Sequence, residues 1–423
     1  MNQAYSLFNI SDKIATLAET CEQEVENLYQ EAEQIALYNQ AKVLKAFQEN
    51  KVSQAHLGQT TGYGYGDIGR EAIEKIFASI FHTEDALVRI QFVSGTHTIA
   101  TVLQAMLLPG DEMLAISGRP YDTLCDVIGL TEKPDPLSLK SYGVSYHQID
   151  LIDKERFDIE KIVEYVKNHT VKMIHIQRSR GYEIRKALYI SDIQEVIQAI
   201  RQVDPNVIIM VDNCYGEFTE TKEPTEVGAD IMCGSLIKNM GGGLAHMGGY
   251  VVGRSDLVGL CANKLTCPGV GREGGATLGQ NRNIMQGIFM APSVVKNAIK
   301  AAVLSAAMLE KLGVAIYPAV WDKRSDIVQT IQFPNAEQQI RFVQGIQSAS
   351  PIDSNVTPYP WDMPGYEDQV IMAAGTFVEG ATIELSADGP VREPYTVYIQ
   401  GGLTYESAKL AICKAIDNMI SEE

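Results

Sequence analysis

Lys238 stands in an unusual setting for a lysine. It lies between a largely apolar segment, Asp230 to Gly234, and the triplet Gly241-Gly242-Gly243, with apolar or small neighbours instead of charges. Most lysines are solvated at the protein surface. A lysine removed from water has a lowered pKa and serves as an amine nucleophile, as Schiff-base chemistry requires. The segment alone leaves a reactive amine and an ordinary surface lysine equally open.

Asp212 follows another apolar segment, Val207 to Val211, 26 residues before Lys238. A carboxylate at the end of a strand that is apolar on both faces needs a positively charged partner. An aspartate at a strand end is also a common cap, so a structural and a functional role both stay open.

Ser94-Gly95-Thr96-His97-Thr98 follows the apolar segment Ala86 to Val93 and opens a segment with helical periodicity. Ligands of open α/β sheets bind beyond the carboxyl ends of the strands. Free backbone N–H groups at such a helix start suit an anion such as phosphate. Plain N-capping of the helix by Ser94 or Thr96 would use the same residues.

Together these residues match the needs of one cofactor. Pyridoxal phosphate (PLP) requires a phosphate cradle, a carboxylate for its protonated ring nitrogen and a lysine for its aldehyde. Tyr121 follows the next apolar segment, Glu112 to Ser117, where its ring could stack on the pyridine. The combination is more specific than any of its parts and predicts a PLP site.

The chain resembles the fold-type-I PLP enzymes of the cysteine and methionine metabolism group, and within that group the aluminium-resistance or methionine gamma-lyase-like proteins. The resemblance covers nearly the whole chain. Its most specific motifs are Val211-Asp-Asn-Cys-Tyr-Gly-Glu217, Gly234-Ser-Leu-Ile-Lys-Asn-Met-Gly-Gly-Gly243 and Leu385-Ser-Ala-Asp-Gly-Pro-Val-Arg-Glu-Pro394.

The resemblance implies a role for each candidate residue. Lys238 would bind the cofactor's aldehyde as a Schiff base, Asp212 would pair with the pyridine nitrogen, and Tyr121 would stack on the ring. The implied phosphate ligands are Ser94, Gly95, Thr96 and Ser235 of the same chain, with Tyr65 and Arg70 supplied by a neighbouring subunit. The implied assembly is a homotetramer built from dimers, with active sites at the dimer interface.

The activity implied by the resemblance is that of a PLP-dependent carbon–sulfur lyase. It would act by β- or γ-elimination on a sulfur amino acid such as cystathionine or methionine, with Lys238, Asp212 and Tyr121 as catalytic residues. Arg392 is the candidate for the substrate carboxylate, because a guanidinium fork binds it bidentately. The alternatives are an aminotransferase, racemase or aldolase, or a PLP-binding stress or metal-tolerance protein with little turnover.

Alternating strand-like and helical segments between residues 71 and 290 are typical of βαβ units around a mostly parallel sheet. We predict a large α/β domain over 71–290 with the PLP-dependent transferase (aspartate aminotransferase-like) fold. Residues 1–70 are predicted to form a helical segment and an interface loop. Residues 291–423 are predicted to form a smaller α+β domain that begins with a long Ala-rich helix, Val294 to Leu312.

The net charge disfavours nucleic acid as a partner and leaves a small molecule as the expected one. The 423 residues carry 35 Lys and Arg against 53 Asp and Glu, a formal charge of −18, which repels a phosphate backbone.

The N-terminus lacks the pattern of a secretory leader, and no segment approaches the roughly 18 apolar residues of a membrane span, so we expect a cytoplasmic protein. The seven cysteines are scattered and indicate reduced thiols, and the seven histidines show no metal-ligand spacing.

Overall fold

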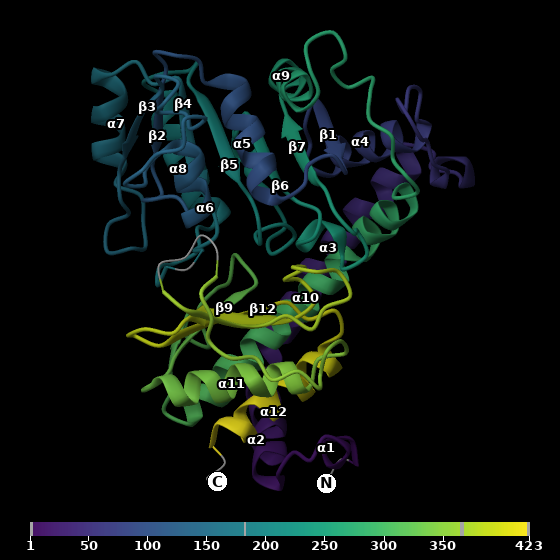
Figure 1. Ribbon diagram of the computed structural model, residues 1–423, viewed down its shortest axis with the longest axis vertical. Coiled ribbons are helices and arrows are strands. Elements are labelled where there is room, and N and C mark those ends of the chain that lie inside the picture. Colours follow the sequence, from purple (N-terminus) through teal and green to yellow (C-terminus); the bar gives the residue numbers. More distant parts are fainter. Residues whose placement is uncertain (1–2, 182, 364–367, 421–423) are drawn as a thin grey trace.

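The computed structural model describes residues 3–181, 183–363 and 368–420. A seven-stranded sheet, in the order β1-β7-β6-β5-β4-β2-β3, occupies its upper part in Figure 1. Strands β2 to β6 are parallel, whereas β7 pairs antiparallel with both β6 and β1. The strands are β1 (Asp85–Arg89), β2 (Glu112–Ala115), β3 (Ser145–Gln148), β4 (Met173–Gln177), β5 (Ile208–Asp212), β6 (Ile231–Ser235) and β7 (Gly249–Gly253).

Helices cover both faces of this sheet. Side chains of successive strand residues point to opposite faces, and in β5 Ile209 and Val211 join one core cluster while Ile208 and Met210 join another. The first cluster packs against α4 (Ile68–Ile80), α7 (Ile159–Asn168) and α8 (Ile190–Arg201). The second packs against α5 (Gly95–Met106), α6 (Asp122–Ile128) and α9 (Ser255–Leu265). By this alternation Asp212, the last residue of β5, points to the α5 side.

A five-stranded antiparallel sheet, in the order β10-β11-β12-β9-β8, lies below the first in Figure 1. Its strands are β8 (Ala315–Tyr317), β9 (Val328–Gln332), β10 (Val370–Ala373), β11 (Ser386–Pro390) and β12 (Thr396–Gln400). The helices α11 (Ala336–Ser348) and α12 (Tyr405–Ile420) pack on it.

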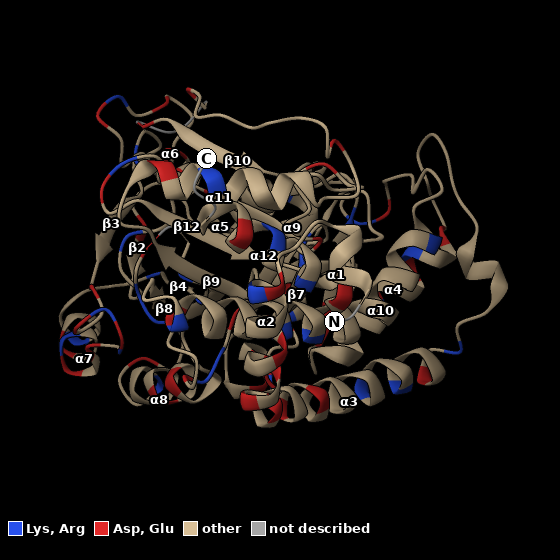
Figure 2. Ribbon diagram, turned by 90° about the horizontal axis from the view of Figure 1, so that it is seen from below, with Lys and Arg blue, Asp and Glu red and all other residues tan. Residues whose placement is uncertain are grey.

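The N-terminal helices are α1 (Gln3–Leu7), α2 (Asp12–Glu24) and α3 (Glu26–Glu49). Tyr5 and the buried face of α2 share a core cluster with the five-stranded sheet, so these helices pack onto the C-terminal part of the same chain. Figure 2 shows acidic residues in the first part of α3 and basic residues nearer its end. Charges of both signs along one helix are typical of a solvated helix face.

Helix α10 (Asn281–Lys311) connects the two parts of the molecule (Figure 1). Its first half contributes Ile288 and Val295 to a core cluster of the large sheet, and its second half contributes Leu304 and Met308 to the cluster of the small sheet. Its length and composition would allow it to cross a membrane, but 61% of its apolar window is buried inside the structure. The predicted Ala-rich helix is therefore present, and it begins earlier than predicted, with Pro292 inside it.

Local patterns place some elements differently from the structure. The sequence predicts a helix from Glu71, but α4 begins at Ile68, because Asp67 caps it by accepting a hydrogen bond from the backbone N–H of Arg70. The sequence also predicts a strand over Thr382 to Leu385. The structure has β11 from Ser386 instead, where the turn-like residues Asp388, Gly389 and Pro390 pair with β10. Strand β8 and helix α11 are not predicted from the sequence.

Candidate active site

Most of the predicted site residues line one cavity of about 930 Å³. It opens at the carboxyl ends of β5 and β6 and at the start of α5, and the five-stranded sheet forms its opposite wall. Gly95, Thr96, Tyr121, Asp212, Ser235, Lys238 and Arg392 are among the lining residues. Segments that are far apart in the sequence thus meet where an open α/β sheet places its ligands.

Lys238 lies three residues beyond the end of β6, with its Nζ 4.1 Å from the centre of the Tyr215 ring. Burial lowers the pKa of Lys238, but Cys214, Tyr215 and Asp212 raise it, and the net direction is well upward. The lowered pKa expected from desolvation alone is therefore wrong. Cys214, Tyr215 and Asp212 together outweigh the loss of water around the amine.

Asp212 is a buried carboxylate at the end of a buried strand. Its Oδ1 accepts a hydrogen bond from the backbone N–H of Cys214 at 3.1 Å. Burial raises the pKa of Asp212, and the charge of Lys238 lowers it only in part. A buried carboxylate of this kind is stabilised by one more positive group, and the protonated ring nitrogen of PLP is such a group.

Tyr121, Thr96 and Gly95 form the other end of the cavity. The Tyr121 hydroxyl donates to Thr96 Oγ1 at 3.0 Å, and burial together with Asp212 raises the pKa of Tyr121. Gly95 begins α5 beside Ser235: a Cβ on Gly95 would lie 3.3 Å from the Ser235 Cβ. The backbone N–H groups of this helix start and the two hydroxyls fit a phosphate group, so the side chains present fit PLP.

Ser94 has a different role from the one expected. Its Oγ accepts a hydrogen bond from the backbone N–H of His97 at 3.0 Å, which makes Ser94 the N-cap of α5, and it does not line the cavity. Ser94 therefore acts as an N-cap, the structural alternative to direct phosphate binding. Its contribution to a phosphate site is to order the helix start on which Gly95 and Thr96 lie.

Arg70 has hydrogen-bond partners within its own chain. Its side chain is buried inside its own chain and donates hydrogen bonds to the backbone carbonyls of Gly64, Gly275 and Glu273. The predicted contact of Arg70 with the phosphate of a neighbouring subunit stays a prediction. Tyr65, by contrast, is 59% exposed and stacks on Tyr63, with their ring centres 5.4 Å apart.

Arg392 lines the cavity from the loop after β11. Its Nη1 lies 2.6 Å from Asp368 Oδ2, and the two side chains remain 59% and 38% exposed. A partly solvated ion pair of this kind can exchange its carboxylate for that of a ligand at small cost.

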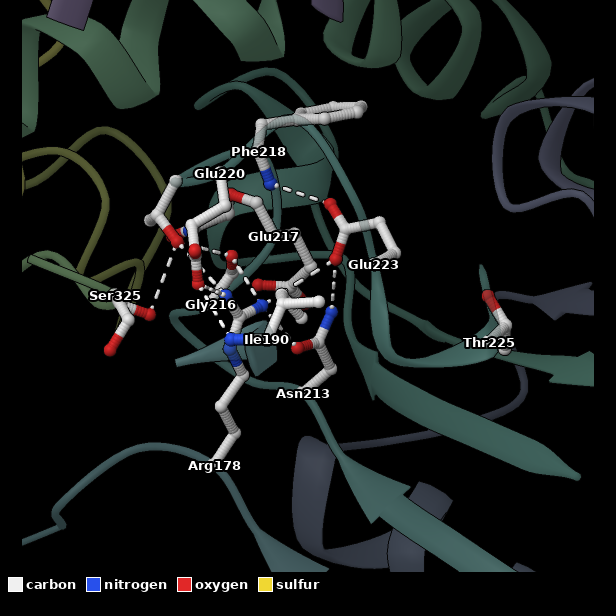
Figure 3. A network of polar contacts seen from close by, with 12 residues as sticks. Arg178, Ile190, Asn213, Gly216, Glu217, Phe218, Glu220, Glu223, Thr225 and Ser325 are labelled. Carbon is white, nitrogen blue, oxygen red and sulfur yellow. Dashed lines mark hydrogen bonds and ion pairs between the residues drawn. The ribbon is translucent and has the colours of Figure 1, made fainter. Parts of the chain in front are cut away.

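A buried network holds the loop that follows Asp212 (Figure 3). Arg178, which is fully buried, donates to Asn213 Oδ1 at 2.9 Å and to the Gly216 carbonyl at 2.8 Å, and its Nη2 lies 3.0 Å from Glu220 Oε1. Asn213 in turn donates to Glu223 at 2.9 Å. These contacts fix the backbone beside Asp212, because the backbone N–H of Arg178 also donates to the Asp212 carbonyl.

Tyr215 is a site residue that the sequence analysis missed. Its φ of +71° is rare for a residue other than glycine, and its ring lies beside the Lys238 amine. Its hydroxyl accepts a hydrogen bond from Thr382 of the opposite wall at 3.4 Å. The signal available was an aromatic residue three positions after Asp212, inside the motif that carried the resemblance.

The methionine gamma-lyase family model matches residues 14–420 of this chain. The chain belongs to the methionine gamma-lyase family. A carbon–sulfur lyase involved in aluminium resistance from Clostridium novyi is 46% identical, with 99% of this chain and 98% of that chain covered and a TM-score of 0.95. A candidate cystathionine beta-lyase involved in aluminium resistance from Clostridium acetobutylicum is 49% identical over 98% and 97% of the chains, with a TM-score of 0.95.

A PLP-dependent protein from Escherichia coli, YhfS, shares the fold at 18% identity and a TM-score of 0.61, with 92% of this chain and 96% of that chain covered. Family membership and these structures confirm the predicted resemblance and fold class. They also support the predicted cofactor and reaction class: the protein is a PLP-dependent carbon–sulfur lyase.

Proposed function

We propose that this enzyme cleaves the carbon–sulfur bond β or γ to the Cα atom of a sulfur amino acid such as cystathionine or methionine. In this reaction the substrate and one water molecule give a thiol, a 2-oxo acid and ammonium. The observation that carries the proposal is the juxtaposition of the Lys238 amine, the buried Asp212 carboxylate and the Tyr121 ring in one cavity. PLP, when bound, supplies an electron sink for the charge that develops at Cα.

Asp212 has the position to hold a proton on the ring nitrogen, because its carboxylate is buried and fixed by the Cys214 backbone. Lys238 would bind the cofactor and then move the proton taken from Cα. Gly95, Thr96 and Ser235 would hold the phosphate, and Arg392 the substrate carboxylate. Tyr121 is the proposed ring-stacking residue and, with Tyr215, a candidate to protonate the leaving thiolate.

We further propose a homo-oligomer, a tetramer built from dimers, that works in the cytoplasm. Exposed Tyr63 and Tyr65 support an interface at the 62–70 segment, since large exposed apolar side chains gather at such surfaces. The seven free cysteines, six of them buried, fit a reducing compartment. The division into residues 1–70, 71–290 and 291–423 stays a proposal as well.

Borohydride reduction followed by mass spectrometry tests the site. We expect a reduced pyridoxyl group on the peptide that contains Lys238, and we expect Lys238→Ala to yield a folded protein without it. An adduct on a different lysine would remove Lys238 from its proposed role.

A panel of amino acids tests the reaction. Release of thiol together with a 2-oxo acid from a sulfur amino acid supports elimination. Amino transfer, loss of chirality or aldehyde release would instead indicate an aminotransferase, a racemase or an aldolase. A formed adduct without any turnover would favour a PLP-binding stress or metal-tolerance protein.

A further inference from the structure

Three arginines line the cavity, and they differ in the groups that their guanidinium nitrogens already bind. Arg180 is 2% exposed and contacts both carboxylate oxygens of Asp326 at 3.2 Å, while its third nitrogen donates to the Tyr317 carbonyl. Its donors are committed to holding the two parts of the chain together. Arg180 therefore has little left to offer a ligand.

Arg392 and Arg119 remain, on opposite walls. Arg392 comes from the small sheet and shares a solvated ion pair with Asp368. Arg119 lies in the segment between β2 and α6, two residues before Tyr121, and is exposed. Within the described part of the chain Arg119 forms no ion pair, and its Nη2 donates a hydrogen bond to the Leu130 carbonyl at 3.3 Å.

We propose that Arg119 determines specificity by binding a carboxylate on the sulfur-linked leaving group of the substrate. This inference rests on the proposed function, in which Arg392 takes the carboxylate next to Cα. Because Arg392 belongs to the small-sheet side of the cavity and Arg119 to the segment after β2, a substrate that binds Arg392 through one carboxylate can present its sulfur substituent to Arg119. Two available guanidinium groups on facing walls suit a substrate with a carboxylate at each end.

Other charges in the cavity refine the substrate class. Asp122 and Asp126 stand four residues apart on α6 and line the same end as Arg119, so an ammonium beside the second carboxylate is also accommodated. Asp388, on the small-sheet wall, is 5% exposed and accepts a hydrogen bond from Gln400 at 3.1 Å. The cavity, at about 930 Å³, lies at the upper end of the roughly 300–1,000 Å³ usual for small-molecule sites, which leaves room for more than a methyl group on sulfur.

Three near-isosteric substituents test the proposal with the holoenzyme. S-carboxymethyl, S-propyl and S-(2-aminoethyl) groups on cysteine, and the same groups on homocysteine, present an anionic, a neutral and a cationic leaving thiol. We expect the wild type to prefer the carboxymethyl substrate over the propyl substrate by about tenfold or more in kcat/KM, the range of one charge-assisted hydrogen bond. Arg119→Met should abolish this preference, mainly through KM, and leave the propyl substrate within about twofold.

The matched control is Arg282→Met, an exposed arginine of α10 outside the cavity, which should behave as the wild type. Equal losses for the anionic and neutral substrates in Arg119→Met, or no loss for either, would overturn the proposal. A calorimetric titration with 3,3′-thiodipropionate and with butanoate adds a readout that needs no turnover. There Arg119→Met should weaken the dicarboxylate about tenfold more than the monocarboxylate.

The two proposals fail in distinguishable ways. If the wild type cleaves none of the six amino acids, carbon–sulfur cleavage of such substrates is refuted. The dicarboxylate titration still decides the assignment of Arg119 in that case, because unchanged binding in Arg119→Met refutes it.

Discussion

At the scale of single residues, Asp212 and Lys238 line the same cavity, and their surroundings affect their charges in opposite ways. Burial raises the pKa of Asp212 and thereby opposes its charge, whereas the groups around Lys238 favour its charge. Their types and spacing were readable from the sequence, because a lone lysine and a strand-end aspartate are each unusual among apolar neighbours. The role of Tyr215 was not predictable from the sequence, because its ring lies beside the Lys238 amine in a backbone conformation with a φ of +71°.

Asp212→Asn tests whether this carboxylate acts in the reaction. An amide can occupy the same position and accept the Cys214 N–H, but it carries no charge to hold a proton on the ring nitrogen. We expect the variant to retain coloured cofactor and to lose about two orders of magnitude in kcat. Steady-state kinetics beside an absorption spectrum measure both properties, and turnover near that of the wild type would make Asp212 a structural cap.

At the scale of elements, the helices and strands that carry the site were largely predictable and their pairing was not. The apolar segments ending near Asp212 and Ser235 became β5 and β6, since buried parallel strands appear as continuous apolar runs. The antiparallel placement of β7 between β6 and β1 depends on long-range pairing, which local patterns do not encode. The contacts of Arg70 could not be predicted for the same reason: its carbonyl partners Gly275 and Glu273 lie about two hundred residues away along the chain.

Gly249→Ala tests how closely α5 must approach the sheet. A Cβ at Gly249 would lie 2.0 Å from Thr98 Oγ1, and Thr98 belongs to the same helix as Gly95 and Thr96. We expect a loss of about 1–3 kcal/mol in unfolding free energy from overpacking, together with weaker cofactor binding as α5 shifts. Denaturant unfolding and PLP titration measure these effects.

The matched control is Gly259→Ala on α9, where no heavy atom lies within 4 Å of the added Cβ. It should leave PLP affinity unchanged and stability equal or slightly higher, because alanine favours a helix. If the Gly249→Ala protein is folded and destabilised but binds PLP with unaltered affinity, the position of α5 does not control cofactor binding.

Glu217, in the loop between β5 and β6, makes stability depend on pH. Burial raises its pKa to about 8, and its Oε1 accepts a hydrogen bond from the Tyr250 hydroxyl at 2.7 Å. Between the ordinary value of 4.5 and about 8, the folded chain therefore holds more protons at this carboxyl than the unfolded chain does. The unfolding free energy should fall as pH rises through this window.

Melting temperatures between about pH 5 and pH 8 check this prediction. Glu217→Gln should lose less stability than the wild type over that range, since the amide does not titrate. Glu49→Gln, an exposed position at the end of α3, should follow the wild type. Parallel curves for all three proteins would show that Glu217 does not ionise on unfolding in this range.

At the scale of the whole molecule, the surface around Tyr63 and Tyr65 has no cover within the described part of the chain. These rings are 78% and 59% exposed, and the backbone of the same segment is tied to residues 273–275 through Arg70. A rigid segment that presents two stacked aromatic rings to solvent is suited to packing against a second copy of the chain. We propose that Tyr65 then contacts the cofactor phosphate of that copy, as the family resemblance implies.

Mixing two defective variants tests this shared site. Lys238→Ala removes the amine from a chain's own cavity, and Tyr65→Ala removes the contact that the chain would give its partner. In a hybrid dimer, the cavity with an intact Lys238 faces a chain with an intact Tyr65, so one complete site is rebuilt. In an equal mixture with random exchange of subunits, activity should return at up to about a quarter of all sites, because about half of the dimers are hybrids and each has one complete site. Hybrids whose formation is confirmed, yet which show no rescue, would confine each active site to a single chain and leave Tyr65 a purely structural residue of the interface.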